Sequence, residues 1–142
     1  MKVAFTDPGH VNGFYLGQFF GLAGWTAAQE GHPLEYVDPR TPGGLDTIAA
    51  LLIPPLDRLG EAQEAALART WAYALAEFDD RDLAWFLLGR LPFAPTHPRD
   101  FLAELARRLF PAGLPEPDPF ARRLDRPEDS LFDLVPPDEW SP

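Results

Sequence analysis

Four glycines are spaced through the most aromatic stretch of the chain, GFYLGQFFGLAG at residues 13–24. On a helix, which advances by about 100° per residue, all four fall on one narrow stripe, and Ala28 and Gly31 continue it. On a strand, Gly24 and Ala28 would lie on the face opposite the first three glycines. The spacing therefore predicts a helix over residues 13–30 with one smooth face that another backbone can approach closely.

The surroundings of this helix follow from its composition. Each glycine inside a helix costs about 1 kcal/mol relative to alanine, so close packing against the stripe has to offset the four. Aromatic and leucine side chains cover the other directions, and a helix that is apolar nearly all round is buried on most sides. We therefore expect a central core helix. A groove that admits a ligand along the stripe is one alternative, and a hairpin at Asn12-Gly13, which is a strong turn signal, is another.

The same region lacks charge from Val11 to Gln29, which is nearly the length of a membrane span. Asn12, Gln18, Thr26 and the glycines argue against a span, and the start of the chain does not resemble a signal peptide. The chain has no cysteine, which excludes disulfides, thiolate catalysis and cysteine-ligated zinc. We therefore expect a cytoplasmic protein with no membrane partner.

Strand signals flank the glycine-striped helix. Residues Lys2–Thr6 read as a short strand, Asp7-Pro8-Gly9 as a turn, and Leu34–Val37 as a second strand. A strand, a helix and a strand in this order predict a βαβ unit with parallel strands. Thr41–Gly44, with the sequence TPGG, reads as a loop.

The rest of the chain up to residue 110 carries further helices. Gly60–Phe78 is the clearest helix, and Pro98 opens another that Pro111 ends. Two segments are ambiguous: we favour a buried strand over a short helix for Thr47–Ile53, and Leu83–Leu88 fits a two-turn helix or a buried strand.

The chain changes character at Pro111. Eight of the last 32 residues are proline and eight are acidic, so this segment should be extended and polar. We therefore expect an α/β domain over residues 1–110, with a small, mainly parallel sheet and a glycine-striped central helix, followed by a proline-rich acidic tail over residues 111–142. The alternative is a mainly α fold with a minor β-hairpin.

Catalytic residues are sparse. Asp7 and His10 would follow the first strand, and Asp38 the second, at the sheet edge where ligands bind in parallel sheets. Asp7 and His10 could serve as acid and base, or bind a metal together with His32, and Asp38 is the third candidate of an enzyme or nucleotide-binding site. However, Asp-Pro-Gly is ordinary turn sequence, and no phosphate-binding glycine motif or serine nucleophile motif occurs. We therefore expect no catalytic set, cofactor or metal, and keep a small α/β enzyme or nucleotide- or metal-binding protein as the alternative.

The tail contains the most suggestive pattern, DSLFDLVPPDEW at residues 129–140. Apolar side chains next to acidic ones suit docking into a hydrophobic groove with a basic rim. The alternative is that the segment folds back onto its own core. The candidate partner-binding residues are Leu131, Phe132, Leu134, Val135 and Trp140, with Asp129 and Asp133.

Charge and composition indicate the class of partner. A net charge of −10 disfavours a phosphate backbone and suits a basic protein. A single Asn, no Cys and 17 prolines are typical of a heat-adapted protein. The preference for arginine over lysine is typical of a GC-rich host or of its phage. We expect a non-enzymatic interaction protein, such as a phage- or host-encoded regulator or inhibitor, that binds a nucleic-acid-handling enzyme such as the transcription machinery.

Overall fold

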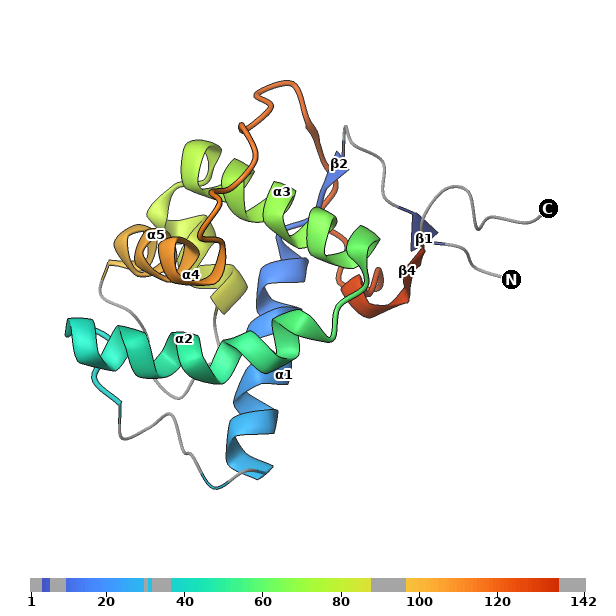
Figure 1. Cartoon of the computed structure of the whole chain (residues 1–142). Helices are drawn as coiled ribbons and strands as arrows, with labels where there is room; N and C mark the ends of the chain where they lie inside the picture. Colours follow the sequence, from blue (N-terminus) through green and yellow to red (C-terminus); the bar gives the residue numbers. More distant parts are fainter. Residues whose placement is uncertain (1–3, 6–9, 30, 32–36, 88–96, 136–142) are drawn as a thin grey trace.

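The computed structural model of the 142-residue chain describes residues 4–5, 10–29, 31, 37–87 and 97–135. Within these residues the protein is mainly helical, with two pairs of very short strands (Figure 1). The mainly α alternative therefore fits better than the α/β arrangement. The helices are α1 (Phe14–Gln29), α2 (Pro42–Asp57), α3 (Glu61–Glu77), α4 (Asp80–Leu87) and α5 (Pro98–Leu109).

The strand pairs join the two ends of the chain. β1 (Ala4–Phe5) pairs in parallel with β4 (Leu134–Val135), and β2 (His10–Val11) pairs in parallel with β3 (Arg122–Arg123). Both pairs are parallel and neither is a hairpin, and each partner strand comes from the C-terminal segment rather than from the residues after α1.

These strand pairings do not form the predicted βαβ unit. Within the predicted strand Leu34–Val37, only Val37 lies in the described part, where it forms a bend. Residues 34–36 and the predicted turn at residues 7–9 lie outside the described residues.

The glycine-striped helix is confirmed as α1, and the residues before it explain why no hairpin forms. The side-chain Oδ1 of Asn12 accepts a hydrogen bond from the backbone N–H of Phe14 at 3.0 Å, and its carbonyl accepts one from Tyr15. Asn12 therefore caps the helix. At Gly13, an added Cβ would lie 2.4 Å from the Phe86 ring, so glycine lets α4 approach the start of α1.

The predicted loop at Thr41–Gly44 and the favoured strand at Thr47–Ile53 are both wrong, because these residues belong to the start and middle of α2. Thr41 is the N-cap, and its Oγ1 accepts a hydrogen bond from the backbone N–H of Gly44 at 3.0 Å. Pro42 follows in the first turn, where a missing N–H costs nothing. The TPGG sequence is thus a helix start.

The apolar run in α2 is a helix because its buried residues recur every four positions. Ile48, Leu52 and Leu56 are buried, whereas Ile53 is 43% exposed. Two prolines, Pro54 and Pro55, lie within the last turn of this helix.

The predicted helices at Gly60–Phe78 and from Pro98 are confirmed as α3 and α5. The ambiguous segment Leu83–Leu88 is helical in α4 as far as Leu87. Asp79 begins this short helix, because its Oδ1 accepts a hydrogen bond from the Asp82 N–H at 2.8 Å.

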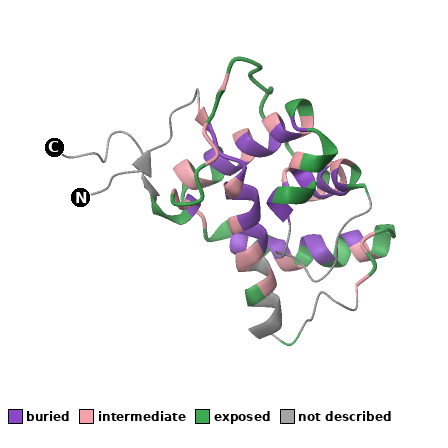
Figure 2. Cartoon of the chain, turned by 180° about the vertical axis from the view of Figure 1, so that it is seen from behind, coloured by how far each residue is buried: buried purple, intermediate pink, exposed green. Residues whose placement is uncertain are grey.

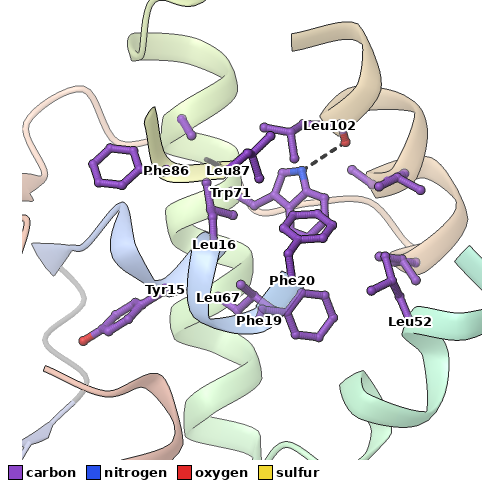
Figure 3. Close-up of a cluster of buried hydrophobic side chains, with 14 of the residues drawn as sticks. Tyr15, Leu16, Phe19, Phe20, Leu52, Leu67, Trp71, Phe86, Leu87 and Leu102 are labelled. Carbon is purple, nitrogen blue, oxygen red and sulfur yellow. Dashed lines mark hydrogen bonds between the residues drawn. The ribbon is translucent and has the colours of Figure 1, made fainter. Parts of the chain in front are cut away.

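The core is centred on Trp71 of α3 (Figure 3). Its ring lies 5.6 Å from the ring centroids of Phe20 and Phe110, and its indole N–H donates to the Leu102 carbonyl at 3.0 Å. Buried residues line the part of α1 that faces the other helices (Figure 2). The fully buried Leu131 joins this core from the C-terminal segment.

Candidate functional site

The C-terminal segment folds back onto the start of α1, and we call residues 122–131 the C-terminal clasp. The side-chain amide of Asn12 donates to the Arg126 carbonyl, and the backbone N–H of Gly13 donates to Oδ1 of Asp125, both at 2.9 Å. The first N–H groups of a helix have no partner within the helix, and its N-terminus favours negative charge. Asp125 therefore meets a hydrogen-bonding need that the helix cannot meet alone.

Gln18, one turn further along α1, holds the end of the clasp. Its amide donates to the Asp129 carbonyl at 2.9 Å and accepts from the Leu131 N–H at 2.7 Å. Tyr15 on the same helix is 2% exposed, and burial raises the pKa of its hydroxyl, with a further increase from the Asp129 charge. The clasp is thus held by paired backbone groups and by the buried Leu131.

Arg123 attaches the clasp to the α3–α4 corner. Its guanidinium lies 4.0 Å from the centroid of the Phe78 ring and forms ion pairs with Asp125 at 2.6 Å and Asp82 at 3.4 Å. The hydrogen bond from Arg123 lowers the pKa of Asp82. Stacking on an aromatic face together with two carboxylates gives this arginine a structural role.

The structure places the candidate partner-binding residues in different environments. Leu131 is 0% exposed and serves the protein's own core, as the folded-back alternative predicts. The neighbouring Phe132 is 37% exposed. Asp129 is half-buried, Asp133 is exposed, Leu134 and Val135 form β4, and Trp140 lies outside the described residues.

Phe132 and Asp133 lie beside the start of α3, where the red C-terminal segment approaches that helix in Figure 1. The side-chain amide of Gln63 donates to the Phe132 carbonyl at 2.8 Å, and its oxygen accepts from the Gly60 N–H at 2.9 Å. One glutamine therefore caps α3 and holds the Phe132 backbone. We call the exposed surface around this contact the acidic corner: Asp57, Glu61, Glu64, Phe132 and Asp133.

The acidic corner has an excess of negative charge. None of its four carboxylates forms an ion pair with another residue that the structure describes. The exposed Arg58 is the cation next to Asp57 in the chain, which leaves four carboxylates against one guanidinium. Other arginines pair with carboxylates elsewhere: Arg40, Arg107, Arg108 and Arg123.

The sequence pattern did not single out Asp57, Glu61 and Glu64 as site residues. Glu61 and Glu64 occupy the first turn of α3, a position where acidic side chains stabilise the helix dipole. They flank Gln63 in the sequence, and the side chain of Gln63 donates to the carbonyl of Phe132, 69 positions further along the chain. The sequence signal for these residues is the pair of glutamates at the start of the periodic helix α3.

The catalytic candidates are not brought together. His10 lies in β2, with its Nε2 3.5 Å from the Leu124 carbonyl, whereas Asp38 pairs with Arg40 just before α2. β2 and the start of α2 lie on opposite sides of the molecule (Figure 1). Asp7 and His32 lie outside the described residues. In the described ranges, no three His, Asp or Glu residues are grouped so that they could hold a metal ion.

Comparison with models of protein families, with curated proteins and with solved structures finds no match to this chain. Among the helices that the structure describes, none has the length and apolar character needed to cross a bilayer. The fold and the site together define a mainly helical protein whose C-terminal segment completes its core and contributes to an acidic surface.

Proposed function

We propose that this chain is a non-enzymatic regulatory protein of the cytoplasm that binds a basic protein surface. The partner class is a nucleic-acid-handling enzyme such as the transcription machinery, and the source is a heat-adapted host or its phage. The observation that carries the proposal is the acidic corner. Its four exposed carboxylates form no ion pair in the described structure, and the partly exposed Phe132 is joined to the start of α3 by Gln63.

The arrangement suits recognition of a basic protein for physical reasons. Enzymes that handle nucleic acids present basic surfaces to the phosphate backbone, and an acidic protein can meet the same surfaces. The carboxylates would speed encounter, and the partly exposed Phe132 would supply apolar contact area. A net charge of −10 adds long-range attraction to such a partner.

The clasp lowers the cost of binding by this surface. Gln63 fixes the Phe132 backbone, and the buried Leu131 precedes Phe132 in the same 3-10 turn (Leu131–Asp133). Because the backbone around the aromatic ring is already ordered, less conformational entropy is lost when a partner docks.

The proposal is tested with purified bacterial core RNA polymerase from a thermophile, immobilised for binding kinetics over a range of sodium chloride concentrations. The variant Glu61→Lys/Glu64→Lys should bind at least about tenfold more weakly, because it reverses two charges in the corner. The matched control, Glu77→Lys/Asp80→Lys, makes the same charge change on two exposed residues, at the last residue of α3 and the first residue of α4. It should retain most of the affinity.

Each outcome addresses a different part of the proposal. If the unmodified chain does not bind the polymerase, the choice of partner is wrong. If the two double variants lose affinity equally, net charge alone drives binding and the acidic corner is not the binding surface. Circular dichroism on both variants establishes that the helices are retained.

A further inference from the structure

Phe120 is the most exposed of the large apolar side chains in the described chain, at 89% of its accessible surface. It lies near the end of the loop at residues 111–121, which we call the proline loop. This loop arches away from the helices between α5 and β3 (Figure 1), and it is drawn almost wholly as exposed in Figure 2. Isolated exposed apolar residues are common at protein surfaces. Whether Phe120 is a binding residue therefore depends on the backbone and the charges around it.

The backbone around Phe120 is ordered by its own hydrogen bonds. The carbonyl of Asp118 accepts from the Ala121 N–H at 3.0 Å, and Oδ1 of Asp118 accepts from the Phe120 N–H at 2.9 Å. Pro119 occupies the second position of this turn, where its fixed φ is favoured. The turn therefore presents the phenylalanine in one backbone conformation.

Both ends of the proline loop are fixed to the folded body. At the start, Gly113 adopts a φ of +95° and its N–H donates to the Phe110 carbonyl at 2.8 Å. At the end, Arg122 pairs with His10 in the β2–β3 ladder, and Arg123 stacks on Phe78. Between these points, prolines at 115, 117 and 119 alternate with acidic residues and restrict the chain to extended conformations.

We infer that Phe120 is a second contact point for the basic protein partner and inserts into an apolar pocket on it. Glu116 and Asp118 are exposed before the ring, and Arg122 is exposed after it. The pocket that fits has a basic side chain on the side of Glu116 and Asp118, and an acidic or neutral group on the other side. This inference rests on the proposed function, and it concerns a surface separate in sequence from the acidic corner.

The test measures binding of the full chain to the same core RNA polymerase with Phe120→Ala and with Trp85→Ala. Trp85 is another exposed aromatic residue, 61% exposed on α4, and serves as the matched control. Removing a ring that becomes buried on binding should weaken the affinity by about 10- to 100-fold. Trp85→Ala should leave it within about twofold.

Melting temperature separates a binding effect from a folding effect. Because Phe120 is exposed in the free protein, Phe120→Ala should melt at the same temperature as the unmodified chain. Asp118→Ala removes the side-chain hydrogen bond that orders the turn and should weaken binding, whereas Asp118→Asn retains an acceptor and should weaken it less.

Several results would overturn the inference. If the unmodified chain binds and Glu61→Lys/Glu64→Lys weakens binding while Phe120→Ala has no effect, the acidic corner stands and Phe120 has no role. Equal losses from Phe120→Ala and Trp85→Ala would indicate non-specific apolar adhesion. If light scattering shows a dimer that Phe120→Ala dissociates, the ring instead contacts a second copy of this chain. If the polymerase binds no version of the protein, the choice of partner is wrong, and the contact between Phe120 and that partner is refuted with it.

Discussion

Replacing Leu131 with alanine tests whether the C-terminal clasp is part of the core. Leu131 is 0% exposed and belongs to the same buried cluster as Leu67 and Trp71. Removing a fully buried leucine side chain costs about 2–5 kcal/mol, because transfer free energy is lost and a cavity remains. We expect Leu131→Ala to lower the free energy of unfolding by about 3 kcal/mol. The backbone N–H of residue 131 also bonds to Gln18, which limits how far the site can collapse.

The assay is urea unfolding followed by circular dichroism at 222 nm, with Phe132→Ala as the control. Phe132 is the next residue and a larger side chain, but it is 37% exposed, so its replacement should cost less than about 1 kcal/mol. If the tail were free in solution, Leu131→Ala would not cost more stability than Phe132→Ala. If Leu131→Ala changes the free energy of unfolding by no more than Phe132→Ala does, the packing of Leu131 in the core is wrong.

Two further predictions concern the start of α1 and the attachment of the clasp. Gly13→Ala should destabilise the protein by about 1–3 kcal/mol in urea unfolding, because the new Cβ meets the Phe86 ring, whereas Gly43→Ala meets nothing within 4 Å and should not. The lowered pKa of Asp82 in the folded state means that its pairing with Arg123 stabilises the fold above about pH 4 and that this stabilisation fades as the pH falls through the lowered pKa. The stability difference between the unmodified chain and Asp82→Asn should therefore shrink between about pH 7 and about pH 3, and a constant difference would exclude this role.

The helices that the sequence predicted correctly carry their signals locally. The glycine stripe sets the period of α1, and the i, i+4 apolar repeat sets that of α3. Pro98 marks the first turn of α5. In each case, the residues that determine the structure lie within a few positions of one another, so the helix can be recognised from the sequence alone.

The start of α2 was missed because its signals have two meanings. Thr41-Pro42 can begin a loop or cap a helix, and the glycines that follow favour a loop. The apolar run from Thr47 to Ile53 ends at two prolines, which resembles the end of a buried strand. Only packing of Ile48 and Leu52 against the other helices decides in favour of a helix.

The site could not be predicted because its contacts join distant parts of the chain. Asn12 bonds to Arg126 and Gly13 to Asp125 across more than 110 residues. Nothing near Asn12-Gly13 in the sequence indicates that the partner of this helix start is an acidic residue of the tail. The composition identified the acidic, aromatic character of the tail, whereas the structure assigns Leu131 to the core and places Phe132 at the acidic corner.

Amide hydrogen exchange of the full chain tests the central structural claim most directly. The clasp forms hydrogen bonds through the backbone N–H groups of Gly13, Leu124 and Leu131. These amides should exchange far more slowly than those of Glu116 and Asp118 in the exposed proline loop, because each of the three is bonded within the folded body. If Leu124 and Leu131 exchange as fast as an unfolded chain while α3 stays protected, the clasp does not form, and neither the acidic corner nor its ordered Phe132 exists as described.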